Sequence, residues 1–440
     1  MSERIVVAGA GLAGSLMAVL LARRGYDVQV YERRGDMRRE PVGRGRSINL
    51  ALSTRGLHAL GVAGLREQVL ASGIPMHGRM IHSLDGGTEL QRYSTDPGEH
   101  LNSVSRHDLN VLLLNEAEKA GVRIHFHEKC LGVEPGRLEV LNEETRAVRS
   151  VDAPRILGAD GAYSAVRAWM QRRDRFDYHQ NYLDWGYKEL HIPPRGNGRH
   201  RIFTNALHIW PRHDFMLIAL PNLDGSFTCT LFLPFEGPQS FAALKTDDDV
   251  LRFFTRQFPD AVAHMPTLVE DYRHNPVSSL VYIRCAPWHV EDRVALLGDA
   301  CHAVVPFYGQ GMNAAFEDCA ALDECIDALA PDWQKVFETY AGMRKPNTDA
   351  LADLSLRNFV EMRDRVVSPL YLAKKKADDV LHRLFPDHWS SLYTMVTFRR
   401  IPYAEAVERA RRQDLALGLA AGAGGLLLAG LALRFTSRFR

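Results

Sequence analysis

Residues 4–32 read RIVVAGAGLAGSLMAVLLARRGYDVQVYE, and this stretch decides the fold. The run Ile5–Ala8 is apolar throughout, as a buried parallel strand requires. The GAGLAG motif of residues 9–14 follows at once, and its glycines let the chain turn tightly. Residues 13–24 have the composition of a helix, which Gly25 ends. The stretch therefore predicts the opening unit of a doubly wound α/β domain.

The end of this unit indicates what the turn binds. The strand Asp27–Tyr31 leads to Glu32, at about the distance beyond the glycines at which an acid binds the ribose of an adenine dinucleotide. The N-terminal N–H groups of the helix would face the pyrophosphate. Because Glu32 would repel a 2′-phosphate, we expect FAD or NAD here and not NADP. A glycine-rich structural turn is the alternative, but the complete series favours a nucleotide.

A second informative stretch is LGDACHAVVPFYGQGMNA, residues 297–314. Asp299 can direct its carboxylate at a sugar hydroxyl, and the helix that begins near Gly311 can direct free N–H groups at an electron-rich ring. Both features suit the far end of a flavin, so the two motifs together suggest a flavin monooxygenase. His302 could serve as a base, but a histidine in a buried turn is more often structural.

Composition limits the other classes of function. The chain has 440 residues, 46% of them hydrophobic, and a net charge of +1, so it can bury a large core and shows no nucleic-acid footprint. Its six cysteines form no C-x-x-C pair, which favours reduced thiols and argues against a metal site. The charged start Met1–Arg4 runs straight into a strand, so we expect no signal peptide and a cytoplasmic body.

The C-terminal tail differs from the rest of the chain. Residues 415–433 contain no charged side chain and are about as long as a bilayer core requires. The tail is therefore predicted to anchor the protein to a membrane. Arginines flank both of its ends, and the body is expected on the cytoplasmic side because no export signal is expected. A hydrophobic helix docked on the body or on a second subunit, in a homodimer, is the alternative.

The remaining chain is interleaved between two folding units. The predicted fold is α/β: a Rossmann-like FAD-binding domain, a mainly antiparallel β-sheet substrate domain, a helical C-terminal region and a hydrophobic tail helix. The expected bounds are 1–75, 100–180 and 285–345 for the FAD-binding domain, 76–99 and 181–284 for the substrate domain, 346–412 for the helical region that closes the substrate pocket, and 413–440 for the tail.

Several motifs together resemble a known family. The glycine turn, Gly158-Ala159-Asp160-Gly161 and Gly298-Asp299 occur in the order seen in FAD-dependent aromatic hydroxylases of the para-hydroxybenzoate hydroxylase class. More specific stretches are similar to the kynurenine-hydroxylating members of that family, and the likeness spans about residues 4–410. These stretches are residues 45–53, 79–83, 358–363 and 392–398.

The resemblance implies a substrate, L-kynurenine, and the residues that bind it. It implies that Arg79 binds the α-carboxylate, for which a guanidinium fork suits better than a lysine. Tyr93 and Tyr393 would share the carboxylate, and Asn358 would lie near the amino-acid end. Without the resemblance, a surface arginine and structural tyrosines would be the more ordinary interpretation.

The resemblance also implies a noncovalent FAD site. It assigns Glu32 to the ribose, Arg106 to the diphosphate region, Asp299 to the ribityl chain and the helix start at Gly311 to the pyrimidine edge. The full set of cofactor-binding residues is Gly9, Gly11, Leu12, Ala13, Gly14, Glu32, Ala51, Arg106, Leu131, Asp160, Asp299, Gly311, Met312 and Asn313. The dry pocket near the flavin would be lined by Pro306, Phe307, Tyr308 and Gln310, for which loop packing is an almost equal alternative.

The implied reaction uses NADPH and O2 as co-substrates and hydroxylates ring position 3 through a flavin C4a-hydroperoxide, in tryptophan degradation. No second glycine motif exists, so NADPH would dock transiently. A basic cluster could attract its phosphates or could be a solvated face: Arg33, Arg34, Arg38, Arg39, Arg44 and Arg46. A membrane-associated hydroxylase of a quinone precursor and a non-enzymatic flavin-binding redox scaffold stay open as alternatives.

Overall fold

A computed structural model describes the backbone of residues 2–39, 49–94, 96–362, 369–385 and 388–436. The side chains of residues 369–373, 375, 379 and 420–436 lie outside that description, as do both ends of the chain and the internal positions 40–48, 95, 363–368 and 386–387. Part of the motif at residues 45–53 therefore falls outside the described residues.

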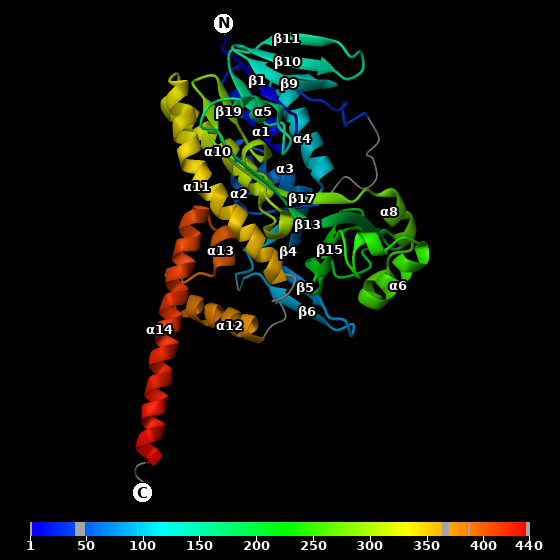
Figure 1. Cartoon of the computed structure of the whole chain (residues 1–440), viewed down its shortest axis with the longest axis vertical. Helices are drawn as coiled ribbons and strands as arrows, with labels where there is room; N and C mark the ends of the chain where they lie inside the picture. Colours follow the sequence, from blue (N-terminus) through cyan, green and yellow to red (C-terminus); the bar gives the residue numbers. More distant parts are fainter. Residues whose placement is uncertain (1, 40–48, 95, 363–368, 386–387, 437–440) are drawn as a thin grey trace.

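The first sheet is the nucleotide-binding one. Its strand order is β18-β19-β12-β1-β2-β8, and all neighbours are parallel except β18 and β19. The strands are β1 (Arg4–Ala8), β2 (Asp27–Tyr31), β8 (Arg123–His125), β12 (Ile156–Gly158), β18 (His289–Val290) and β19 (Val294–Leu296). Strands from three separate regions of the chain, residues 4–31, 123–158 and 289–296, thus lie side by side (Figure 1), which fits the predicted interleaving.

Helices cover this sheet. Helix α1 (Leu12–Arg23) packs against α4 (Arg106–Lys119) and α10 (Gly311–Leu329). Residues 14–21 of α1 are buried without interruption, so this helix is central and not amphipathic. A meander of β9 (Glu128–Glu134), β10 (Arg137–Asn142) and β11 (Val148–Asp152) lies beside the nucleotide-binding sheet, where β9 contacts β2. Helix α5 (Ala165–Met170) packs against β9.

The second large sheet has seven strands in the order β17-β13-β16-β15-β14-β5-β6, antiparallel except for β14 and β5. Its strands are β5 (Gly78–His82), β6 (Thr88–Arg92), β13 (Asp177–Ile192), β14 (Leu207–Arg212), β15 (Phe215–Pro221), β16 (Phe227–Pro234) and β17 (Ser278–Ala286). The predicted mainly antiparallel sheet is thus present.

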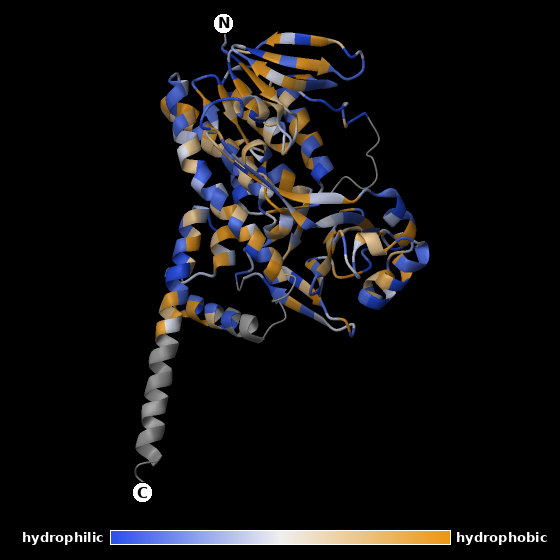
Figure 2. Ribbon diagram, viewed as in Figure 1, coloured by the Kyte–Doolittle hydropathy of each residue, from blue (hydrophilic) through white to orange (hydrophobic). Residues whose placement is uncertain are grey.

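The two faces of this sheet have different partners. One face, with Trp210 and Phe227, packs against the helical layer of α6 (Asp247–Gln257), α7 (Pro259–Val262) and α8 (Leu268–His274). Ile81 and Ile209 belong to the other face, which packs against Phe307. Because side chains alternate along a strand, Arg79 shares the face of Ile81 and is directed away from α6–α8. Figure 2 shows both hydrophilic and hydrophobic residues on α6, as expected of a helix with one buried face.

Shorter elements connect the two sheets. They are the small sheet β3 (Leu50–Leu52), β7 (Leu101–Val104) and β4 (Ile74–Met76), the helices α2 (Thr54–Val62), α3 (Arg66–Ala71) and α9 (Asp299–His302), and the 3-10 turns η1 (Phe241–Ala243) and η2 (Pro306–Tyr308). The C-terminal helices are α11 (Trp333–Val360), α12 (Pro369–Leu384), α13 (Leu392–Thr397) and α14 (Tyr403–Thr436).

The predicted membrane span at residues 415–433 is not supported by the described part of the chain. Among the residues searched there, no helix is long and apolar enough to cross a membrane. Residues before that stretch belong to the body instead: Tyr403, Ala406 and Ala410 are buried in a cluster with residues of α11 and α13. Most side chains of the apolar stretch itself lie outside the described residues.

Candidate active site

The glycine turn has two kinds of glycine. Gly9 has φ +98°, and a Cβ there would lie 2.6 Å from the Ala159 carbonyl oxygen, whereas a Cβ at Gly14 would overlap the Gly9 carbonyl oxygen. The fold itself thus requires these two glycines. A Cβ at Gly11 would meet nothing within 4 Å. The open space above Gly11, at the N-terminus of α1 where Leu12 and Ala13 begin the helix, is where a pyrophosphate fits.

Glu32 is held beside this turn at the end of β2. Its Oε2 accepts a hydrogen bond from the Ala10 backbone N–H (2.8 Å), and its Oε1 accepts from the backbone (3.0 Å) and Nε (2.7 Å) of Arg34. Burial alone would raise the pKa of Glu32, but the bonds from Arg34 and Ala10 hold that pKa below its usual value. The carboxylate is therefore a charged acceptor in a fixed orientation, as ribose binding needs.

Three other residues assigned to the cofactor differ in their surroundings. Asp160 follows β12, and its Oδ2 accepts from the Ala165 N–H (2.7 Å) at the start of α5. Its Oδ1 is buried and has no hydrogen-bond partner among the described residues, and burial raises the pKa of Asp160. Arg106, the first residue of α4, and Leu131 on β9 are both exposed.

Asn313 joins the two segments expected at the flavin ring. Its Nδ2 donates to the carbonyl oxygens of Ala51 (2.9 Å) and Gly309 (2.8 Å), and its Oδ1 accepts from the Ser53 backbone N–H (2.9 Å). The side chain thus fixes β3 against the start of α10. Because the Asn313 side chain is used in these bonds, the cofactor would meet the N-terminus of α10 at Gly311 and Met312. The helix dipole favours negative charge at that end. Asp299 is the exposed first residue of α9.

These residues fit FAD. The space above Gly11, the oriented Glu32 carboxylate and the unpartnered Asp160 oxygen lie along the carboxyl end of the parallel strands, where such sheets bind nucleotides. The start of α10 would then face the isoalloxazine ring.

A cavity of about 460 Å³ brings the four predicted substrate residues together. Arg79 comes from β5, Tyr93 follows β6, Asn358 lies near the end of α11 and Tyr393 lies in α13. The Tyr93 and Tyr393 rings stack at 5.3 Å, and the Arg79 guanidinium lies 4.8 Å from the Tyr393 ring centre and 5.9 Å from that of Tyr93. Two regions far apart in the sequence, residues 79–93 and 358–393, thus meet at one cavity with a cationic and aromatic wall.

The electrostatics of this wall suit an anion. Burial raises the pKa of Tyr93 well above its usual value and also raises the pKa of Tyr393, while the Arg79 guanidinium acts in the opposite direction on both. Both phenols are therefore neutral donors at physiological pH. A cation and two hydroxyl donors in one buried place match a carboxylate.

Aromatic residues form the adjoining wall. Tyr308 lines the cavity and stacks on Tyr393 at 5.8 Å, and Phe307 stacks on Phe359 at 4.2 Å. Asn358 donates through Nδ2 to the Phe307 carbonyl oxygen (2.7 Å), so it holds η2, which Pro306 begins. Gln310 is buried, and its Oε1 accepts from the Tyr403 hydroxyl (3.2 Å).

Sequence reasoning missed a further set of charged and polar residues that line the cavity: Gln91, Arg92, Arg357, Glu361, Lys374, Asp378 and Ser391. Two of them had a usable signal. Arg357 directly precedes Asn358, and Glu361 follows Asn358 by about one helical turn. The other members come from β6, α12 and the start of α13, which only the fold brings together.

Among the described arginines of the basic cluster considered for NADPH, Arg34, Arg38 and Arg39 pair with acids. Arg34 pairs with Glu32, and Arg38 pairs with Asp36 (2.8 Å) and Glu118 (2.5 Å). Arg44 and Arg46 lie outside the described residues. Charge alone therefore does not single out this face for the phosphates of NADPH.

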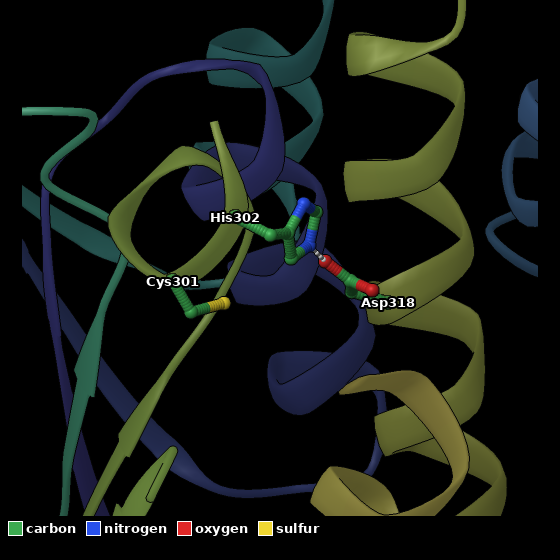
Figure 3. Close-up of side chains that lie close together, drawn as sticks. All are labelled: Cys301, His302 and Asp318. Atoms are coloured by element: carbon green, nitrogen blue, oxygen red, sulfur yellow. Dashed lines mark hydrogen bonds and ion pairs between the residues drawn. The ribbon is translucent and has the colours of Figure 1, made fainter. Parts of the chain in front are cut away.

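The cluster of Cys301, His302 and Asp318 is buried beside α9 (Figure 3). Asp318 bonds His302 Nε2 and accepts from Arg344 Nε (2.7 Å) and the Gly298 backbone N–H (3.2 Å). Burial raises the pKa of the Cys301 thiol well above its usual value, so it stays protonated and donates to the Gly298 carbonyl oxygen (3.2 Å). Asp318 thus pairs with His302, and Asp318 and Cys301 both bind the backbone of the α9 turn, whereas His302 Nδ1 has no hydrogen-bond partner among the described residues.

Comparison with known proteins agrees with this geometry. Residues 3–355 match the family of FAD binding domains. The fold is similar to that of 2-methyl-3-hydroxypyridine-5-carboxylic acid oxygenase, with a TM-score of 0.67 at 22% identity over 84% of this chain and 94% of that one. It is also similar to Pseudomonas aeruginosa PqsL in complex with 2-aminobenzoylacetate, with a TM-score of 0.68 at 20% identity over 83% and 98%. The class is thus that of proteins with an FAD-binding domain of this family.

Sequence identity narrows the class. The chain is 51% identical to the kynurenine 3-monooxygenase of Salinispora tropica over 98% of its own length and 95% of that protein. It is 46% identical to the kynurenine 3-monooxygenase of Dictyostelium discoideum over 92% and 90%. The chain belongs to the kynurenine 3-monooxygenase family.

Proposed function

We propose that this protein is an FAD-dependent monooxygenase that hydroxylates L-kynurenine at ring position 3 with NADPH and O2. The observation that carries the proposal is the cavity in which Arg79, Tyr93 and Tyr393 converge. FAD, which the glycine turn, Glu32 and the start of α10 would hold, would supply the redox chemistry that couples NADPH oxidation to the transfer of one oxygen atom from O2 to the ring. The other oxygen atom leaves as water.

The chain's own residues bind and orient the substrate. Arg79 binds the α-carboxylate with help from the Tyr93 and Tyr393 hydroxyls. Glu361 and Asp378 line the same cavity and supply the charge opposite to that of the α-ammonium group. The aniline ring then lies along Tyr308 and Phe307 toward the start of α10, which faces the flavin.

The aniline nitrogen already activates the ring carbon next to it, so position and dryness matter more than a protein base. Burial of the aromatic wall keeps water from the reacting atoms, which limits the loss of the activated oxygen as hydrogen peroxide. His302 bonds Asp318 and is not used as a base in this scheme.

The test is substrate-stimulated NADPH oxidation by the purified yellow protein. L-kynurenine should accelerate NADPH oxidation and yield a product heavier by one oxygen atom, whereas a ubiquinone precursor should not. Product formation from the ubiquinone precursor alone would favour the quinone-precursor alternative. Flavin binding without any hydroxylated product would favour the redox scaffold.

Finer points stay predictions: the domain bounds, a homodimer and membrane association through residues 415–433. Removal of the chain after Arg412 tests the last of these in a fractionation experiment. If the tail attaches the protein to a membrane, the truncated protein should leave the membrane pellet while full-length protein remains in it. A full-length protein found wholly in the supernatant without detergent contradicts the anchor.

A further inference from the structure

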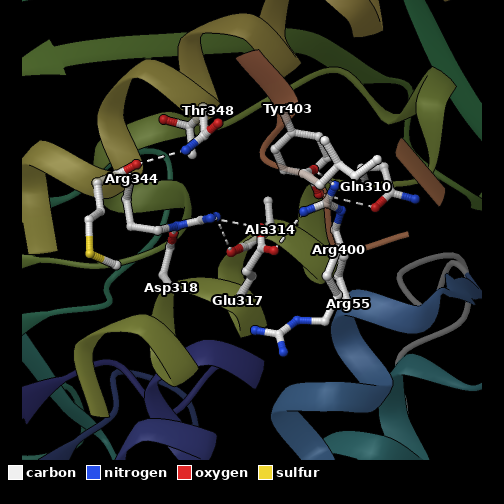
Figure 4. Close-up of polar contacts among 12 residues, drawn as sticks. Arg55, Gln310, Ala314, Glu317, Asp318, Arg344, Thr348, Arg400 and Tyr403 are labelled. Carbon is white, nitrogen blue, oxygen red and sulfur yellow. Dashed lines mark hydrogen bonds and ion pairs between the residues drawn. The ribbon is translucent and has the colours of Figure 1, made fainter. Parts of the chain in front are cut away.

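A buried chain of charges runs between the two halves of the candidate site (Figure 4). Arg55 Nη1 donates to Glu317 Oε1 (2.6 Å), Arg344 Nη1 donates to Glu317 Oε2 (2.7 Å), and Arg344 Nε donates to Asp318 Oδ1 (2.7 Å). The Arg55 and Asp318 side chains are 0% exposed. We call Arg55, Glu317, Arg344 and Asp318 the Arg55 network.

One end of the Arg55 network holds the substrate side. Arg55 Nε donates to the Val396 carbonyl oxygen (2.9 Å), and a second guanidinium nitrogen donates to the Ile401 carbonyl oxygen. Val396 lies in the last turn of α13, where helix carbonyls lack intrahelical partners. Tyr393 lies on this same six-residue helix. Arg55 therefore fixes the helix that carries a wall of the cavity.

The other end holds the flavin side. Asp318 Oδ2 accepts from the Gly298 backbone N–H and bonds His302, so it fixes the turn that presents Asp299. The Arg55 guanidinium lies 3.9 Å over the Tyr403 ring, and the Tyr403 hydroxyl donates to Gln310, the N-cap residue of α10. Both segments that face the flavin are thus tied to the same network.

A buried ion network contributes less to stability than well-packed apolar residues of similar volume, but it fixes directions that apolar contacts do not. The helix that carries Tyr393 and the segments that face the flavin must keep a fixed relative position. A small displacement between the reacting atoms strongly lowers the rate of oxygen transfer. The Arg55 network supplies a rigid connection of this kind between Tyr393 and the flavin-facing segments.

We propose that Arg55 is a positioning residue that keeps the kynurenine ring in register with the flavin, so that reducing equivalents go into product. The inference rests on the proposed function. In the coupled reaction NADPH, a proton, O2 and kynurenine give NADP⁺, water and hydroxykynurenine. In the uncoupled reaction NADPH, a proton and O2 give NADP⁺ and hydrogen peroxide, and kynurenine is unchanged.

The test uses Arg55→Lys, which keeps the charge but cannot reach Glu317 and both carbonyl oxygens at once. Tyr403→Phe is a milder variant that keeps the ring under Arg55 and removes only the bond to Gln310. The matched control is Arg24→Lys, because Arg24 also pairs with an acid of α10, Asp323 (2.6 Å), but on the side of α1. All three are purified with FAD bound.

Two readouts are compared with wild type. The ratio of hydroxykynurenine formed to NADPH consumed should fall by about threefold or more in Arg55→Lys, the effect of losing at least one charged hydrogen bond. The same ratio should fall less in Tyr403→Phe. In both variants the KM for kynurenine should change less than the ratio does. The change in flavin absorbance on adding kynurenine to the oxidised enzyme should also shrink. Arg24→Lys should match wild type in both readouts.

Unchanged ratios and absorbance changes in Arg55→Lys and Tyr403→Phe overturn the inference. If Arg55→Lys fails to fold, Tyr403→Phe decides alone, with a lowered ratio in support and an unchanged one against. A wild type that forms no hydroxykynurenine overturns the proposed function and the inference with it. A wild type that forms it while both variants stay coupled overturns the inference only.

Discussion

Arg79 illustrates how a single residue acquires its role from its surroundings. It is 7% exposed, and the rings of Tyr93 and Tyr393 lie beside its guanidinium. The guanidinium is a planar fork of donors that matches the two oxygens of a carboxylate. The fork and the two phenol hydroxyls lie at the same cavity, which is the physical reason to place the substrate's carboxylate here.

Arg79→Ala should raise the KM for L-kynurenine by roughly tenfold to a hundredfold, because a hydrogen bond to a charged group is worth about 1.5–3 kcal/mol. Steady-state kinetics measure this change. FAD content should stay at the wild-type value. Replacement of the exposed Arg137 of the meander by alanine is the control and should leave KM unchanged. An unaltered KM in Arg79→Ala would remove the residue from substrate binding.

Glu32→Gln should weaken FAD retention, because the amide cannot accept from both Ala10 and Arg34 and bind a ribose hydroxyl with the same charge. Bound flavin is measured by absorbance after dialysis at dilute protein. Glu134→Gln, an exposed site at the end of β9, should keep its FAD. Full occupancy in Glu32→Gln would contradict the ribose assignment.

At the scale of elements, α13 is the least self-sufficient part of the site. A six-residue helix is too short to be stable alone, so its caps and contacts must hold it. Ser391 accepts from the Thr394 N–H (3.1 Å) at its start, and Arg55 binds its last turn. Tyr393 is therefore placed by tertiary contacts at both ends of the helix.

Ser391→Ala should lower stability by about 1 kcal/mol, the usual cost of losing a helix cap, and should also raise the KM for kynurenine. Thermal unfolding and steady-state kinetics measure the two effects. Thr246→Ala removes the corresponding cap of α6, whose capping box lies away from the cavity. That variant should lose similar stability with an unchanged KM. A rise in KM in both variants would mean that stability, and not the position of Tyr393, sets the affinity.

Local sequence signals predicted several elements well. The strand Asp27–Tyr31 has the predicted bounds, and the helix expected over residues 13–24 is α1, Leu12–Arg23. Both elements belong to the unit whose pattern is strongest in the sequence.

At the scale of the whole molecule, the two large sheets share one chain that passes between them several times. The second sheet buries a cluster of polar residues under α7. His82 bonds both Asp260 (2.6 Å) and His208 (2.8 Å), and Trp210 donates to Asp260 (3.0 Å). Burial lowers the pKa of His208 to about 4 from its ordinary value of 6.5. The folded protein therefore holds His208 neutral at a pH where the unfolded chain would protonate it.

Stability should fall as the pH is lowered from about 6.5 to 4, because the unfolded state binds a proton at His208 that the folded state does not. The full contribution of neutral His208 to the free energy of unfolding is present above pH 6.5 and is lost as the pH falls toward 4. Burial also lowers the pKa of His125 and His264, in the same direction.

Thermal unfolding measured across this pH range checks the expectation. His208→Gln, which cannot be protonated, should remove up to about 3 kcal/mol of the difference between the two ends of the range. A wild-type melting temperature that stays constant down to pH 4 would contradict a buried neutral His208.

The sequence by itself determined the nucleotide-binding unit of this protein. Gly9, Gly14 and Glu32 act within one strand–turn–helix–strand unit, so their spacing along the chain nearly fixes their spacing in space. The family motifs likewise indicated the four substrate residues, although not how they meet.

Tertiary structure alone decided the geometry of the cavity and the Arg55 network. Arg79 and Tyr393 are more than three hundred positions apart in the printed sequence, and Arg55 reaches Val396 and Ile401 across a similar separation. Local propensity carries no information on such pairs, because they form only when the second sheet and the C-terminal helices pack against the nucleotide-binding domain. Local propensity likewise does not predict the pKa shifts of Tyr93 and His208, because burial causes them and burial is a property of tertiary packing.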